Sequence, residues 1–163
     1  SAIAASRLLI LTGCRLGEIM RLKWDYVDFA GRALRLPDSK TGAKVVHLGQ
    51  PAIDVLKGIE RIEDNPWVIT GTLEGAPLYD LQPFWQRVRA RAGLKDVRIH
   101  DLRHTFASTA VAEGQGLPII GKLLGHTQVQ TTARYAHLAA DPVRRAADQV
   151  SGEIASLLNE RAA

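Results

Sequence analysis

The sequence contains little cysteine, few aromatic residues and no long apolar run. Cys14 is the single cysteine among 163 residues, so the chain cannot form an internal disulfide or a cysteine cluster for a metal. The longest apolar stretch, Leu8 to Leu11, is far too short to span a membrane. Carboxylates are not clustered either, which argues against a site built on two metal ions. These absences predict a folded protein of a reducing cytoplasm, with Cys14 as a small buried side chain.

The composition is that of a globular chain with a basic bias. Hydrophobic residues make up 46% and charged residues 23%, and the length suits one domain over residues 1–163. Lys and Arg number 21 against 17 Asp and Glu, and 15 of these cations are Arg. Guanidinium groups bind phosphate through two parallel hydrogen bonds. The chain is therefore predicted to have a phosphate-bearing partner.

Periodicity and turn residues predict a mainly α-helical domain with one small antiparallel β-hairpin, an α+β fold. Helices are expected over residues 3–11, 15–22, 51–62, 81–92, 101–113, 117–124, 129–138 and 142–159, and strands over 33–36 and 44–48. The abrupt apolar start, without a helix-capping signal before it, predicts a fragment of a longer protein.

Three local groups of residues could carry chemistry, although each has an ordinary structural explanation. His100 and Arg103 lie one helical turn apart, but such residues commonly cap and pair at helix starts. His100 and His104 have the spacing of a two-histidine metal site, but no ligand-like acid accompanies them and Arg103 would repel a cation. His126 reads as a helix C-cap, and Tyr135 reads as a packing residue. The same packing role is expected of the other two tyrosines, Tyr26 and Tyr79.

Taken together and in order, these groups resemble the tyrosine recombinases, the phage-integrase family of site-specific DNA recombinases. Thr12 to Glu18, reading TGCRLGE, is similar to the first arginine box of that family, and Ser39 to Gly42 is similar to its hairpin lysine segment. His100 to Thr105 resembles the H-x-x-R box, and Leu124 to His126 the L-G-H box. Thr131 to His137 resembles the segment that carries the nucleophile. The resemblance implies the catalytic-domain fold of these DNA breaking and rejoining enzymes.

The resemblance also implies a role for each boxed residue. The catalytic set would be Arg15, Lys40, His100, Arg103, His126 and Tyr135. Arg15 and Arg103 would stabilise the charge that grows on the phosphate oxygens, with a further hydrogen bond from His126. Tyr135 would attack phosphorus and form a 3′-phosphotyrosyl link. Lys40 would protonate the departing 5′ oxygen.

Supporting roles and competitors follow from the same boxes. Glu18 is expected to orient Arg15, and His104 and His137 to take buried or supporting positions. His100 would donate to the phosphate or help to manage the proton of the attacking phenol. Lys44, which also flanks the hairpin turn, competes with Lys40 for the lysine role. No metal and no cofactor are expected, because the arginines would replace a metal.

The implied partner is double-stranded DNA carrying recombination sites. The N-terminal core-binding domain of the family is expected to be absent from this fragment, which would weaken DNA binding. A basic stripe is a candidate for contacts to the DNA backbone, and it comprises Arg87, Arg89, Arg91, Lys95 and Arg98. A homotetramer is expected on DNA, with weak or no association of the free fragment and no membrane partner.

The C-terminal segment 142–163 carries a narrow apolar stripe, and it is expected to dock on a neighbouring protomer or to fold back on its own domain. The stripe comprises Val143, Ala147, Val150, Ile154 and Leu157. The alternative is a helix that completes the core of its own domain.

Two rival functions remain open at this point. A type IB topoisomerase uses nearly the same constellation to nick and reseal one strand. A DNA-binding fragment without autonomous activity is the second rival, although all six catalytic positions are filled. The expected setting is the cytoplasm, for a bacterial or phage-encoded protein.

Overall fold

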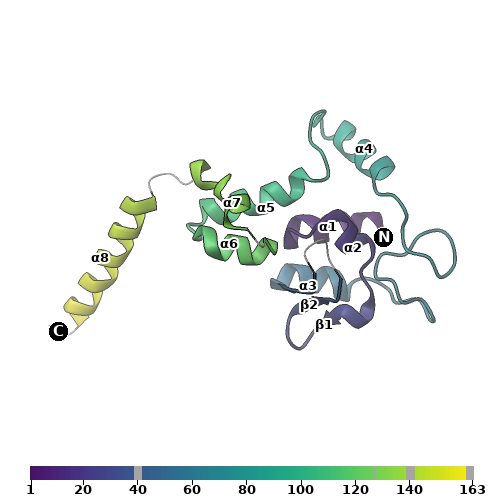
Figure 1. Ribbon diagram of the computed structural model, residues 1–163, viewed down its shortest axis with the longest axis horizontal. Coiled ribbons are helices and arrows are strands. Elements are labelled where there is room, and N and C mark those ends of the chain that lie inside the picture. The colour runs from purple at the N-terminus through teal and green to yellow at the C-terminus, as the bar shows by residue number, and fades with distance from the viewer. Residues whose placement is uncertain (39–41, 127, 139–141, 161–163) are drawn as a thin grey trace.

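The computed structural model describes residues 1–38, 42–126, 128–138 and 142–160 of the chain. The expected lysine segment Ser39 to Thr41, with Lys40 at its centre, lies outside the described residues. The helices are α1 (Ala2–Thr12), α2 (Leu16–Met20), η1 (Trp24–Tyr26), α3 (Gln50–Lys57), α4 (Gln82–Arg91), α5 (Asp101–Ala112), α6 (Leu117–Leu124), α7 (Val129–Ala133), η2 (Ala136–Leu138) and α8 (Pro142–Glu160). The strands are β1 (Val27–Asp28), β2 (Ala33–Leu36) and β3 (Lys44–His47). This arrangement confirms the mainly helical fold with a small antiparallel sheet (Figure 1).

The three strands form one antiparallel sheet in the order β1, β2, β3. Strands β2 and β3 are the predicted hairpin, with Leu34 opposite Val46. Both of these side chains are buried, whereas Arg35 on the next position of β2 is exposed, as the two-residue period of a half-buried strand requires. The sequence did not predict β1, because a two-residue strand is too short to show a period.

The larger of two hydrophobic cores lies between α1, α2, α3 and the sheet. Its most deeply buried members include Leu8, Ile19, Leu22, Leu34 and Leu56. Cys14 is a free cysteine buried in the same cluster, as predicted. This core fixes the end of α1 and the start of α2, where the first arginine box lies.

A smaller core lies between α5, α6 and the residue that follows α7. It consists of Ala107, Val111, Ile120, Leu124 and Tyr135, with partly buried neighbours around it. Helix α5 joins the two cores, because its early residue Leu102 packs into the larger one. In Figure 1 α5 accordingly runs between the body that holds α1 and the pair α6 and α7.

Two predicted helices differ from those observed. The helix expected over 51–62 ends at Lys57. Gly58 is its C-cap, and the Gly58 amide donates a hydrogen bond to the Asp54 carbonyl. The helix expected over 129–138 is interrupted at Tyr135. There, the Tyr135 amide donates a hydrogen bond to the Thr132 carbonyl at 3.0 Å. A bond between residues three positions apart is that of a 3₁₀ turn. The interruption places the Tyr135 ring in the smaller core.

Helix α8 projects away from the rest of the chain, with its end farthest from the body (Figure 1). The described side chains of its apolar stripe are all exposed.

The position of Tyr79 contradicts the packing role expected of this residue, because Tyr79 lies in a loop and is 98% exposed. None of the helices in the described ranges combines the length and the apolar character that a membrane crossing requires.

Candidate active site

Arg15 immediately precedes α2 and is held there by Glu18. The Arg15 backbone is extended, and its amide donates to Glu18 Oε2 at 2.8 Å. The same carboxylate accepts from Arg15 Nη1 through Oε1 at 3.1 Å. This side chain closes the first turn of α2 in the manner of a capping box. Glu18 therefore orients both the backbone and the guanidinium of Arg15, which keeps a partly exposed edge.

Lys44 on β3 completes this network. Its Nζ lies 2.8 Å from both carboxylate oxygens of Glu18, and the two side chains are only 9% and 6% exposed. Burial acts to raise the pKa of Glu18, but the hydrogen bonds from Lys44 and the Arg15 amide outweigh it, so the pKa lies below its usual value. A lysine paired in this way is poorly suited to swing into a reaction as a proton donor.

Arg103 on α5 is buried, and its guanidinium binds the C-terminal ends of two helices. Its Nη1 donates to the carbonyl of Gly13, which ends α1, and its Nη2 donates to the carbonyl of Leu124 at 2.8 Å. The last carbonyls of a helix lack partners and carry partial negative charge, so they suit a buried cation. A guanidinium has five N–H groups. The two carbonyls engage two of them, one on each amino group.

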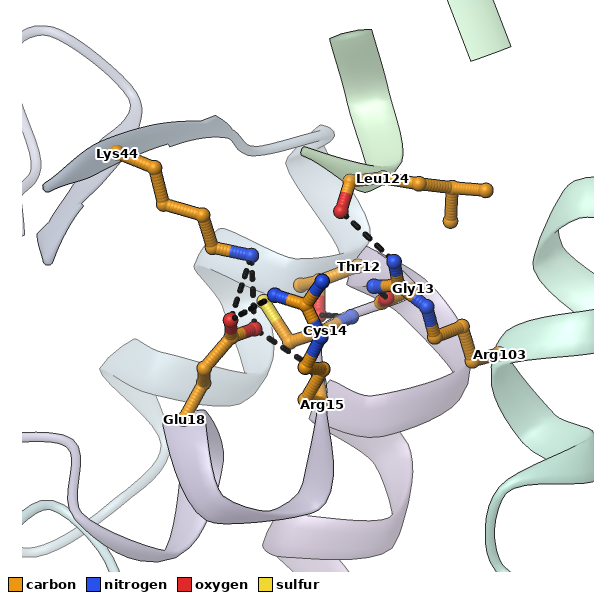
Figure 2. A network of polar contacts seen from close by, with 8 residues as sticks. All are labelled: Thr12, Gly13, Cys14, Arg15, Glu18, Lys44, Arg103 and Leu124. Carbon is orange, nitrogen blue, oxygen red and sulfur yellow. Dashed lines mark hydrogen bonds and ion pairs between the residues drawn. The ribbon is translucent and has the colours of Figure 1, made fainter. Parts of the chain in front are cut away.

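A glycine is required where α1 ends beside Arg103. Gly13 has a φ of 63°, in the left-handed region that glycine adopts freely. A Cβ atom there would lie 2.6 Å from the ring of Phe106 and 2.9 Å from the side chain of Leu124. This close approach brings the Gly13 carbonyl within reach of Arg103. Figure 2 shows the guanidinium of Arg103 between these carbonyls, on the side toward Arg15.

His126 follows the left-handed cap residue of α6. Its Nδ1 lies 2.8 Å from the hydroxyl of the buried Thr132. Burial lowers the pKa of His126 to about 4, and the positive charges of Arg103 and Arg15 act in the same direction. The ring is therefore neutral at pH 7. The Thr132 hydroxyl occupies Nδ1, so Nε2 is the ring nitrogen that is left to meet a ligand.

Tyr135 is 5% exposed, and its hydroxyl oxygen lies 2.6 Å from Nδ1 of His104. The sequence left His100 either to donate to the phosphate or to help manage the phenol proton, whereas the structure places His104 at the hydroxyl. His100 is exposed and meets His104 edge to face, with ring centroids 4.9 Å apart. Burial raises the pKa of the Tyr135 phenol, and the charges of Arg103 and Arg134 oppose this shift without cancelling it.

The remaining predicted residues are spread over the surface near this site. His137 on η2 is exposed, which contradicts the buried one of the two positions expected of it, buried or supporting, because the 3₁₀ turn directs Tyr135 rather than His137 into the core. In the basic stripe, Arg98 pairs with Asp101 at 3.4 Å and Arg89 is half-buried. Arg98 is exposed despite this ion pair, and so are the other three members, namely Arg87, Arg91 and Lys95.

A cavity of about 340 Å³ connects the stripe to the box residues. Arg89, Arg98, His100 and Arg103 all line it. Two contacts of the site were not predicted from the sequence. These are the contact of the Thr132 hydroxyl with His126 Nδ1 and the ion pair of Lys44 with Glu18. Within the described ranges, no group of three or more acidic, histidine or cysteine side chains is arranged to hold a metal ion.

Comparison with known proteins gives concordant matches. The model described as the Phage integrase family matches residues 2–141. The chain is 31% identical over 153 residues to the tyrosine recombinase XerC of Mycobacterium leprae, covering 87% of this chain and 51% of that protein. It is 30% identical over 155 residues to the integrase of Salmonella phage P22, covering 85% and 40%. The chain thus spans about half the length of these curated relatives or less.

Solved structures share the fold. The crystal structure of XerA recombinase aligns with a TM-score of 0.68 at 26% identity, covering 91% of this chain and 56% of that one. The catalytic domain of bacteriophage HP1 integrase aligns with a TM-score of 0.66 at 23% identity, covering 89% and 79%. These matches confirm the catalytic-domain fold expected from the sequence.

Proposed function

We propose a reaction for this chain, which belongs to the phage integrase family. The proposed function is site-specific cleavage and rejoining of DNA through a 3′-phosphotyrosyl intermediate, in DNA integration and recombination. The observation that carries it is the convergence of Arg15, Arg103 and His126, because Arg103 bonds the carbonyl of Gly13, two residues before Arg15, and that of Leu124, two residues before His126 (Figure 2). The side chain of Tyr135 lies within electrostatic reach of Arg103 in the same region.

The chemistry of phosphodiester cleavage explains this convergence. As a nucleophile adds to phosphorus, negative charge grows on the non-bridging oxygens, and fixed cationic donors stabilise it. Arg15 offers a partly exposed guanidinium, and Arg103 offers the N–H groups that Gly13 and Leu124 do not use. In this proposal the ring proton of neutral His126 lies on Nε2 and adds a third donor.

Two proton movements complete the proposed reaction. Tyr135 must lose its phenolic proton to attack phosphorus, and the departing 5′ oxygen must gain one. We assign the second proton to Lys40, which lies outside the described residues. The burial of Lys44 against Glu18 favours Lys40 over Lys44 for this role.

The proposed substrate is double-stranded DNA at recombination sites, bound by a tetramer in the cytoplasm of a bacterium. The basic stripe supports contacts to the DNA backbone, since four of its five side chains are exposed. The exposed apolar side chains of α8 support the proposed assembly. They are 53% to 78% exposed and belong to Val143, Val150, Ile154 and Leu157. We propose that this stripe packs into a groove on a neighbouring protomer within the DNA complex. Without DNA, the chain is a monomer in this proposal.

Covalent trapping tests the proposal directly. The full-length protein is incubated with a nicked suicide substrate in EDTA, and the adduct is mapped by mass spectrometry. We expect phosphotyrosine at Tyr135, undiminished by the chelator because no step requires a metal. An adduct on Tyr26 or Tyr79, an adduct that survives Tyr135→Phe, or activity that returns only with magnesium would refute the mechanism.

The same preparation distinguishes the rival functions. Strand exchange between paired sites is expected of a recombinase, and relaxation of supercoiled DNA without exchange is expected of a type IB topoisomerase. The comparisons give the topoisomerase alternative no support. A chain that binds DNA and forms no covalent adduct would be the inactive DNA-binding fragment.

A further inference from the structure

We propose that His104 is a catalytic residue, the base that takes the phenolic proton of Tyr135. This inference rests on the proposed function and deepens it by assigning its first proton transfer. The carrying observation is the 2.6 Å distance between Nδ1 of His104 and the Tyr135 hydroxyl oxygen, which is hydrogen-bond distance for an O–H donor.

The packing around the pair holds this contact in place. Tyr135 is a member of the smaller core, so its ring is fixed by neighbours on α5 and α6. His104 is half-buried on α5, one residue after Arg103, and the two rings lie 5.9 Å apart at 52°. A side chain fixed by packing gives a more precise reaction geometry than one in a loop. The donor and the acceptor are thus positioned before DNA arrives.

The position of His104 also favours it over His100. His100 is exposed, and the structure shows it in edge-to-face contact with His104. His104 therefore lies between the solvent-exposed histidine and the buried tyrosine. A base must be within hydrogen-bond reach of the proton that it removes, and His104 meets this requirement.

The proposed step balances. The O–H bond of Tyr135 breaks and its proton moves to Nδ1 of His104, which becomes an imidazolium. The freed electron pair on the phenolate oxygen forms the bond to phosphorus, and the bond from phosphorus to the 5′ oxygen breaks. The 5′ oxygen takes a proton from Lys40 in the proposed reaction. On rejoining, the 5′ hydroxyl gives its proton back to the neutral Lys40 amine as its oxygen attacks phosphorus, the bond from phosphorus to the tyrosine oxygen breaks, and the His104 imidazolium returns its proton to the departing tyrosine.

A substrate with sulfur in place of the bridging 5′ oxygen separates the two proton transfers. A thiolate leaves without protonation, because its conjugate acid is far stronger than an alcohol. Loss of the acid is therefore masked on this substrate, whereas loss of the base is not. The test uses the full-length protein in single-turnover cleavage of matched oxygen and sulfur substrates.

The informative variant is His104→Asn, whose side-chain oxygen can accept the hydrogen bond near the position of Nδ1 but cannot take up a proton. We expect cleavage to slow by about 10²-fold to 10⁴-fold on both substrates, the usual range for a general base. The Lys40→Ala variant should cleave the oxygen substrate slowly, and its cleavage rate should be restored on the sulfur substrate. His47→Asn, at an exposed histidine of β3, is the matched control and should cleave both substrates at the rate of the unaltered protein.

Two results would overturn the inference. His104→Asn that cleaves both substrates at the unaltered rate would reduce His104 to a packing residue. His104→Asn that is rescued by sulfur would place His104 on the leaving-group side. Melting temperature and DNA affinity identify a misfolded variant, in which case His104→Gln provides the second measurement. Failure of the unaltered protein to form any adduct would instead refute the proposed function.

Discussion

Glu18 and Lys44 form an ion pair in which one ammonium contacts both carboxylate oxygens at 2.8 Å, in a nearly solvent-free position. The pair joins β3 to the first turn of α2, where the same carboxylate binds Arg15. Lys44 also lies beside Gly125, where an added Cβ atom would be 3.0 Å from its side chain. One lysine therefore connects the segments that carry Arg15 and His126.

The first prediction concerns the stability of this pair. Lys44→Met should lower the free energy of unfolding by about 3 kcal/mol or more, because it leaves the Glu18 carboxylate buried with one cation fewer. Arg35→Met is the matched control, since Arg35 pairs with Asp28 in an exposed position and should contribute much less. Urea denaturation measures both variants. Equal losses would show that the Glu18 pair has no special role.

The second prediction concerns pH. The folded pKa of His126, about 4, lies below the unfolded value of about 6.5, so the unfolded chain binds more protons between these two values. Stability is then fully present above about pH 6.5 and falls as the pH is lowered toward 4. The pKa of His100 is also lowered, so it contributes in the same direction. His126→Gln should show a shallower loss over this range, and an unchanged slope would contradict the burial of His126.

The third prediction separates the two arginines. Arg15→Ala and Arg103→Ala should each reduce cleavage by at least about 10²-fold, the scale for removing one preorganised donor. Their effects on stability should differ, because Arg103→Ala also leaves the carbonyls of Gly13 and Leu124 without a buried donor. Thermal melting in parallel with adduct formation measures both effects. An arginine variant with near-normal cleavage would remove that residue from the proposed site.

The fourth prediction concerns α8. Ile154→Asp should weaken assembly on DNA while leaving the melting temperature of the free chain nearly unchanged, because Ile154 is 53% exposed in the free chain. Ser151→Asp, also on α8 but outside the apolar stripe, is the control and should assemble normally. Native gel electrophoresis of DNA complexes gives the readout. If Ile154→Asp unfolds the free chain, the helix belongs to its own core.

Local signals predicted the elements well, and long-range contacts escaped prediction. Helix α6 has the bounds expected from the sequence, because Pro118 marks its start and Gly125 its end. The contact between His104 and Tyr135 joins residues 31 positions apart, and Arg103 reaches Gly13 across 90. Neither the spacing of residues nor the composition predicts such a contact, because the contact arises from the packing of α5 against other helices.

The site residues themselves were found through the resemblance rather than through local chemistry. Arg103, His126 and Tyr135 each have an ordinary structural explanation when taken alone. Their joint order with Arg15 identified them, and Arg103 links the segments that precede Arg15 and His126 through its bonds to Gly13 and Leu124. The hydrogen-bond partner of His126 Nδ1 was missed, because a threonine six residues away carries no sequence signal of that role.

The division into two cores of unequal size has a consequence for how the chain opens. Few side chains hold the α5–α6 core together, and Tyr135 is one of them. The free energy of local opening falls with the amount of buried contact, so amide hydrogens of α6 should exchange with solvent before those of α1. A chain opened in this way keeps Arg15 and its carboxylate partner in place but loses the position of its nucleophile. In the proposed reaction, such a molecule would keep one phosphate-binding arginine in place and lack the group that attacks phosphorus.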